Sequence, residues 1–190
     1  MTLRTRFGHQ FTLAATVTAL AAASITIGAQ TGPTSQAATA KFVTSAALEP
    51  LLPAPPGWTR TRTRGSEVVV SDSCGYSFAD ATYTNGDMKV QVTLADTGRN
   101  EESLGLLAVL VVSFPDNYSG EVPPATSIAR LTLNGAPAGS RWDAELRDGE
   151  FVALVDRRFV AKIEGTKLDS IATLRGILEL IDLKKLGGLK

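Results

Sequence analysis

Strict alternation of apolar and polar side chains over residues 88–94 constrains this chain more than any other feature. Met88, Val90, Val92 and Leu94 are apolar, and the residues between them are polar. A period of two is typical of a strand with one buried face and one exposed face. The segment therefore predicts a half-buried β-strand.

Turn signals then divide the chain into short strand-like runs. Asn85-Gly86, Asn134-Gly135 and Asp148-Gly149 each lie between such runs, and these dipeptides favour the type I′ turns of β-hairpins. Asp156-Arg157-Arg158 joins two further apolar runs and predicts a tight turn. The pattern indicates an antiparallel meander, and we expect an α+β fold with a mainly antiparallel sheet of five to seven strands.

Two segments predict helices packed on one face of that sheet. Residues 166–186 predict an amphipathic C-terminal helix with Thr166 as its N-cap, because apolar residues recur at spacings of three and four. Residues 101–113 are expected to form a second helix, with a buried strand as the alternative. The apolar stripe of the C-terminal helix consists of Leu168, Ile171, Leu174, Ile177, Leu178 and Ile181.

Residues 1–40 have the layout of a secretory signal peptide. Arg4 and Arg6 precede an uncharged stretch over residues 11–29, and Ala37 and Ala40 each end a small-x-small cleavage site. We expect export to the periplasm or the extracellular space, and no transmembrane segment in the mature chain. An uncleaved anchor is the alternative, because residues 11–29 are just long enough to cross a bilayer.

Residues 41–65 are expected to form a Pro- and Thr-rich arm or linker ahead of a single domain over residues 66–190. Three prolines within residues 53–56 hold the backbone extended. A short helical turn is expected before them, since Leu48, Leu51 and Leu52 would share one face.

The histidine count excludes several catalytic classes. His9 is the only histidine, and it lies in the expected leader. The mature chain therefore cannot build a Ser-His-Asp triad, a Cys-His pair, a histidine zinc site or a His-ligated haem. We expect no metal and no cofactor.

The sequence has 19 basic and 19 acidic side chains, and the expected leader contains two of the basic ones, Arg4 and Arg6. The mature chain therefore has a net charge of −2, which excludes a strongly basic nucleic-acid binder.

Arg60, Arg62 and Arg64 alternate with threonines directly after Trp58. Alternate residues of an extended chain share a face, so the three guanidinium groups are expected to form a row. Such a row suits phosphate, sulfate or carboxylate groups, with Trp58 stacking on a ring. These four residues are the candidate ligand-binding set. The alternative is an edge strand whose charges prevent sheets from joining.

Cys74 is the only cysteine, so it is a thiol without an internal disulfide. It is either a buried small residue or a reactive thiol.

Paired carboxylates are the remaining acid–base groups, and Asp143, Glu145, Asp148 and Glu150 lie close together in the sequence. Their alternation with apolar residues is typical of a solvated face, and a carboxylate-dependent hydrolase is the catalytic alternative.

Several phrases resemble a group of small exported bacterial proteins of unknown function, over residues 48–186. The order of the expected elements is also similar to that of the PsbP-like fold. The resemblance implies no catalytic residue, and Cys74 falls where that group would carry a small residue. The phrases are Leu51-Leu52-Pro53 with Gly57-Trp58, Val70-Ser71-Asp72-Ser73, Asn134-Gly135, Leu154-Val155-Asp156-Arg157-Arg158-Phe159-Val160 with Gly165, and Ile181-Asp182.

These features predict an exported cell-envelope binding or accessory protein that is not an enzyme. Its partner is expected to be an unknown envelope component or an anionic surface. A structural subunit of an envelope complex is the remaining alternative.

We expect the exported protein to begin at residue 38 or 41, directly after one of the two cleavage sites. Intact-mass measurement or N-terminal sequencing of the secreted protein checks this. Recovery of His9 in the mature protein would contradict the expectation and would reopen the histidine chemistry.

Overall fold

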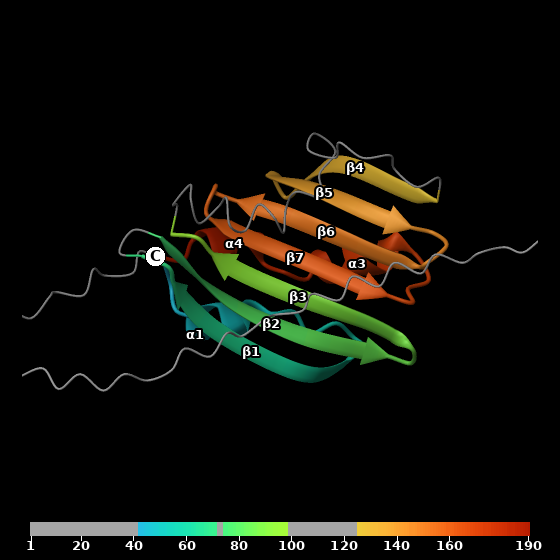
Figure 1. Ribbon diagram of the computed structural model, residues 1–190, viewed down its shortest axis with the longest axis horizontal. Coiled ribbons are helices and arrows are strands. Elements are labelled where there is room, and N and C mark those ends of the chain that lie inside the picture. Colours follow the sequence, from blue (N-terminus) through green and yellow to red (C-terminus); the bar gives the residue numbers. More distant parts are fainter. Residues whose placement is uncertain (1–41, 72–73, 99–124) are drawn as a thin grey trace, which may run out of the picture. The chain divides into compact units, whose positions relative to one another are not determined.

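The computed structural model describes residues 42–71, 74–98 and 125–190. They form a seven-stranded antiparallel sheet in the order β1-β2-β3-β7-β6-β5-β4 (Figure 1). The expected sheet is confirmed, and the fold is mainly β. The strands are β1 (Thr59–Val69), β2 (Gly75–Asn85), β3 (Met88–Asp96), β4 (Thr126–Leu133), β5 (Ala136–Asp143), β6 (Asp148–Val155) and β7 (Phe159–Thr166).

Two meanders meet in the middle of the sheet. Strands β1 to β3 pair in sequence order, strands β4 to β7 do the same, and β3 pairs with β7. The predicted alternation is seen in β3, where Val90, Val92 and Leu94 are fully buried. The meander prediction therefore holds within each half.

The hairpin turns confirm one type I′ prediction and correct another. Asn134 and Gly135 have φ angles of 49° and 86°, both positive as a type I′ turn requires. Asn85, in contrast, pairs with Met88, so that Gly86-Asp87 forms the turn. Only the first of these two residues has a positive φ, 58°, which is the type II′ pattern.

The turn predicted at Asp148-Gly149 is wrong. Asp148 pairs with Asp143 and begins β6. The chain turns earlier because the Asp143 carboxylate accepts hydrogen bonds from the N–H groups of Glu145 (3.0 Å) and Leu146 (2.9 Å).

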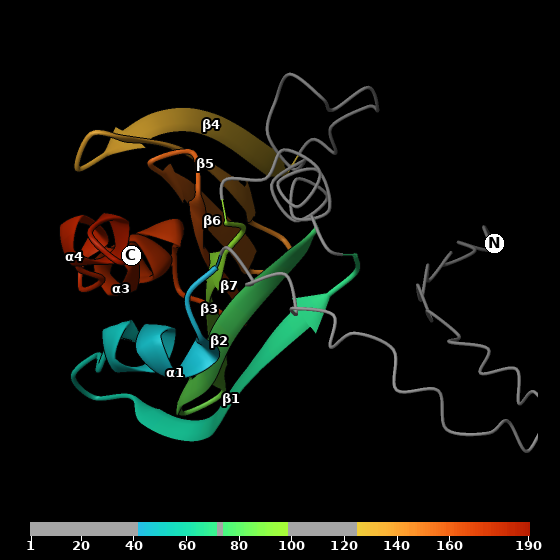
Figure 2. The same cartoon turned by 90° about the vertical axis from the view of Figure 1, so that its left-hand side faces the viewer.

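The described helices lie on one face of the sheet, which we call the inner face (Figure 2). They are α1 (Ser45–Leu48), the 3-10 helix η1 (Glu49–Leu51), α3 (Ile171–Leu178) and α4 (Leu183–Gly187). None of them is long and apolar enough to span a bilayer. The expected leader and the element predicted over residues 101–113 lie outside the described residues.

The C-terminal segment forms two short helices instead of the one predicted over residues 166–186. Thr166 ends β7, Lys167 has a positive φ of 58°, and α3 begins only after Ser170. A second helix starts at Asp182, whose carboxylate accepts a hydrogen bond from the Lys185 N–H at 2.8 Å.

The apolar stripe of this segment is nevertheless buried on the sheet, as the sequence predicts. Close approach of α3 depends on Gly149, because a Cβ there would lie 2.9 Å from Trp142 and 3.1 Å from Leu174. The buried side chains of the segment are Leu168, Leu174, Ile177, Leu178, Ile181, Leu183 and Leu186, and Ile171 is half-buried.

The expected arm contributes to the same core. The predicted helical turn is present, and Leu48, Leu51 and Leu52 are buried. The Tyr83 hydroxyl donates a hydrogen bond of 2.6 Å to the Pro53 carbonyl, which fixes the proline-rich loop on the sheet. The boundary expected at residue 65 falls inside β1.

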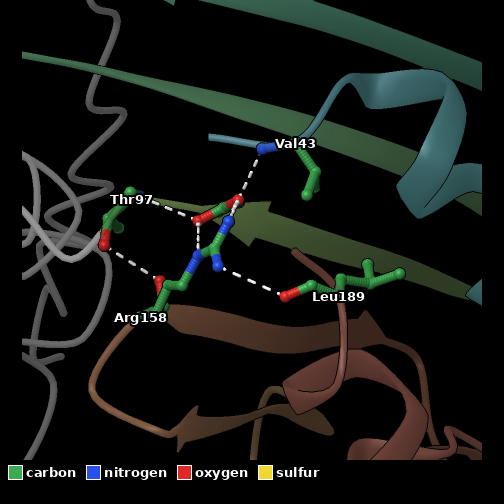
Figure 3. Close-up of polar contacts among 6 residues, drawn as sticks. Val43, Thr97, Arg158 and Leu189 are labelled. Carbon is green, nitrogen blue, oxygen red and sulfur yellow. Dashed lines mark hydrogen bonds and ion pairs between the residues drawn. The ribbon is translucent and has the colours of Figure 1, made fainter. Parts of the chain in front are cut away.

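A buried ion pair joins the first and last parts of this fold (Figure 3). Arg158, in the predicted tight turn before β7, donates to both oxygens of Asp96 at 2.8 and 2.7 Å. Asp96 also accepts the N–H groups of Val43 (2.7 Å) and Gly98 (2.8 Å). Arg158 reaches the carbonyl of Leu189 at 3.2 Å. We call this arrangement the Asp96 clasp.

We predict that Asp96→Ala lowers the free energy of unfolding by about 3–5 kcal/mol, because it leaves the buried guanidinium of Arg158 without its partner. Urea denaturation measures the loss. The matched control is Asp169→Ala, which removes an exposed ion pair with Arg147 and should cost less than about 1 kcal/mol. Equal losses in the two variants would contradict a special role for the clasp.

Candidate functional site

The three arginines of the candidate binding set do not form a row. Arg60 lies opposite Tyr83, whereas Arg62 lies opposite Thr82, since a β-bulge interrupts the register between the two arginines. A bulge adds one residue and so moves the following side chains to the other face. Arg60 therefore lies on the inner face, with its guanidinium carbon 5.4 Å from the centroid of the Tyr83 ring. The prediction that all three arginines share one face is wrong.

Two of the three arginine side chains of β1 already form hydrogen bonds or ion pairs with other groups of the protein. Arg60 donates to the Pro53 carbonyl at 2.9 Å. Arg64 donates hydrogen bonds of 2.6–3.0 Å to both oxygens of the buried Asp80. These hydrogen bonds raise the pKa of Arg64 above its ordinary value. Trp58 is half-buried and packs against the core. Arg62 is exposed on a strand at the edge of the sheet, a position that fits the edge-protection alternative.

Cys74 is buried, with 8% of its surface exposed. Its N–H donates to Ser71 in the turn before β2. This supports the interpretation of Cys74 as a small packed residue.

Two of the clustered carboxylates are buried instead of solvated. Asp143 is 8% exposed and Glu150 is 7% exposed, while Glu145 lies in solvent. Asp143 is held by the turn N–H groups described above and by the Thr126 hydroxyl at 3.2 Å. Glu150 points to the face of the sheet opposite the helices, which we call the outer face.

The outer face carries two adjoining hollows. The first, of about 220 Å³, is lined by side chains of β1, β2, β3 and β7. The second, of about 270 Å³, is lined by β3, β5, β6 and β7. Gln91 and Glu164 line both, so the hollows adjoin each other, and together we call them the outer cleft.

The first hollow combines an aromatic wall with paired charges. Tyr76 and Phe78 lie side by side with ring centroids 6.3 Å apart. The Arg64–Asp80 pair lies along the same strands, and Lys162 faces it from β7. Aromatic surface beside fixed polar groups is typical of a ligand pocket.

The second hollow is more polar. Lys89 and Arg141 line it together with three carboxylates, those of Asp148, Glu150 and Glu164. Lys162, which lines the first hollow, contacts the last two of these carboxylates, at 3.8 Å for Glu150 and 2.7 Å for Glu164.

A larger cavity of about 1090 Å³ lies between two hairpin turns and the ends of α3 and α4. Two of its acidic groups already have partners in the fold. The Asp182 carboxylate caps α4, and Glu179 pairs with Arg175 at 2.9 Å. The outer cleft is therefore the better candidate site, because its polar side chains converge from several strands.

Sequence reasoning found Arg64 but missed Gln91, Lys162 and Glu164. All three are polar positions in strands that alternate with buried apolar residues. The alternation shows that they share the outer side of their strands, but pairing of β3 with β7 is what brings them together.

No protein-family model matches the chain, and no curated protein matches it. The candidate site therefore rests on the geometry of the outer cleft.

We predict that Asp143 stabilises the fold in a pH-dependent way. Hydrogen bonds, chiefly from the Leu146 N–H, hold the pKa of Asp143 below its ordinary value, which is about 3.9. A lowered pKa in the folded state gives stability that is present above about pH 4 and is lost as the pH falls through the folded pKa. Asp143→Asn should therefore be less stable than the wild type at neutral pH, with a difference that shrinks in acid.

Urea unfolding at about pH 7 and about pH 3 measures this difference. Glu145→Gln, which changes an exposed carboxylate of the same turn, is the control. A difference for Asp143→Asn that stays constant across this range would contradict the prediction.

Proposed function

We propose that this protein is an exported binding module of the cell envelope, and that it holds its ligand in the outer cleft without transforming it. The observation that carries the proposal is the pair of adjoining hollows that share Gln91 and Glu164 in their linings, with charged and polar side chains around them. Export is supported by the layout of residues 1–40 and by the resemblance to a group of small exported bacterial proteins of unknown function.

The charge balance of the first hollow favours an uncharged ligand. Arg64 is neutralised by Asp80 and Lys162 by Glu164. Such pairs present hydrogen-bond donors and acceptors side by side without net charge, which suits neighbouring hydroxyl groups. Tyr76 and Phe78 offer aromatic surface for the apolar side of the same ligand.

The dimensions favour a chain of small units. Each hollow is smaller than a typical pocket for a drug-sized ligand, which measures about 300–1,000 Å³, so each suits one ring-sized unit. From Ala95 to Lys89 the cleft follows β3 for six residues, or about 20 Å at the rise of a strand. A segment of a hydroxyl-rich envelope polymer fits this shape.

An anionic surface is a less favoured partner than this polymer. Of the three arginines that suggested such a surface, Arg60 and Arg64 already bind groups of the protein itself. Binding in the first hollow should accordingly persist at high salt, whereas contact of a basic strand with an anionic surface would fade.

We predict that Gln91→Ala weakens binding about tenfold, because it removes hydrogen bonds worth about 1.4 kcal/mol in both hollows. Titration calorimetry with cello-, malto- and chitin oligosaccharides measures the affinity. The control is Arg62→Gln, which changes an exposed side chain outside both hollows. Absence of binding to all three oligosaccharide classes, or equal loss in the two variants, would contradict the proposal.

A further inference from the structure

Two carboxylates in the second hollow share one cation. Glu150 and Glu164 lie directly opposite each other on β6 and β7, and like charges in that position repel. The Lys162 ammonium contacts Glu164 at 2.7 Å but Glu150 only at 3.8 Å. Among the described residues no other basic group lies within ion-pair distance of either carboxylate. The side chains of Glu150, Glu164 and Lys162 therefore carry a net charge of −1 among them, and the other charged groups that line the hollow are Lys89, Arg141 and Asp148.

Glu150 is the less satisfied member of the pair. Its side chain is 9% exposed, and its Oε1 has no hydrogen-bond partner among the described residues. A buried carboxylate oxygen without a donor is strongly unfavourable. Glu150 lines the second hollow, and its last side-chain torsion is soft. The carboxylate can therefore turn an oxygen toward a group bound there.

The missing partner has the chemistry of a cationic donor. Within the described ranges, no three carboxylate, thiol or imidazole groups gather as a metal ion would require. An ammonium group needs only the two carboxylates, and it donates charge-assisted hydrogen bonds to both.

We propose that the second hollow binds a protonated primary amine carried by one unit of the ligand, with its ammonium group between Glu150 and Glu164. This inference rests on the proposed function, since the amine belongs to the same hydroxyl-rich chain. The first hollow then binds an uncharged part of the ligand, and Glu150 is the residue that selects an amino-bearing unit.

The test compares chitosan oligosaccharides, which carry free amines, with chitin oligosaccharides of equal length, in which the amines are acetylated. Titration calorimetry of the full mature protein is carried out at a pH where the sugar amine is protonated. We expect the wild type to bind the amine form about tenfold more tightly than the acetylated form. Glu150→Gln should remove this preference, so that the two forms bind with equal affinity.

Glu145→Gln is the matched control and should keep the preference, because Glu145 lies outside the hollow. Thermal unfolding verifies that each variant is folded, and the preference of the wild type is itself a test that needs no variant. Equal binding of the two forms by the wild type would overturn the amine site and leave the proposed function standing. Binding of neither form would overturn both.

Discussion

The carboxylate of Asp96 connects the N-terminal and C-terminal segments of the described domain to the sheet. It lies at the end of β3 with its side chain fully buried, and it accepts four hydrogen bonds from three separate parts of the chain. A buried ion pair is tolerated when its remaining hydrogen-bonding capacity is satisfied, and here each oxygen of Asp96 accepts two donors. Through Val43 the clasp fixes the segment before α1, and through Arg158 it fixes the carbonyl of Leu189 near the C-terminus. The helices that cover the inner face are thus tied to the sheet from both ends.

Covering the inner face determines what the outer face can do. The central strands carry alanines toward the helices, at positions 79, 81, 153 and 161, all with no exposed surface, and small side chains allow close packing. The apolar core is complete on that side. On the outer face the buried apolar cluster consists of Ala95, Val152 and Val160, with Tyr76, Phe78 and Leu154 packed against it. Charged side chains lie further along β6 and β7. The outer face therefore combines a firm backbone platform with polar side chains that the core does not need.

The sequence predicts what depends on local periodicity and turn chemistry. The alternation of residues 88–94, the turn at Asn134-Gly135 and the buried Leu and Ile stripe of residues 168–186 are all seen in the structure. What depends on register could not be predicted. The bulge between Arg60 and Arg62 separates a row that simple alternation predicts, and Asp143 moves a turn that Asp148-Gly149 suggests. Asp96 and Arg158 are 62 residues apart in sequence, so no local pattern joins them, and the same holds for Gln91 and Glu164 of the outer cleft.

The ion pairs of the outer face differ from the clasp in what they connect. Arg64–Asp80 joins β1 to β2, and Lys162 joins β7 to β6, but these strands are already held by their backbone ladders. Partly buried ion pairs are often no more stabilising than apolar side chains of similar size. Apolar replacements on this face would extend the adjoining cluster of Ala95, Val152 and Val160, so stability gives little reason for the charges. Paired charges next to a hollow are instead useful for recognition, because they hold donors and acceptors in fixed directions before a ligand arrives. In the proposed amine complex, the bound ammonium group would offset the cost of desolvating Glu150.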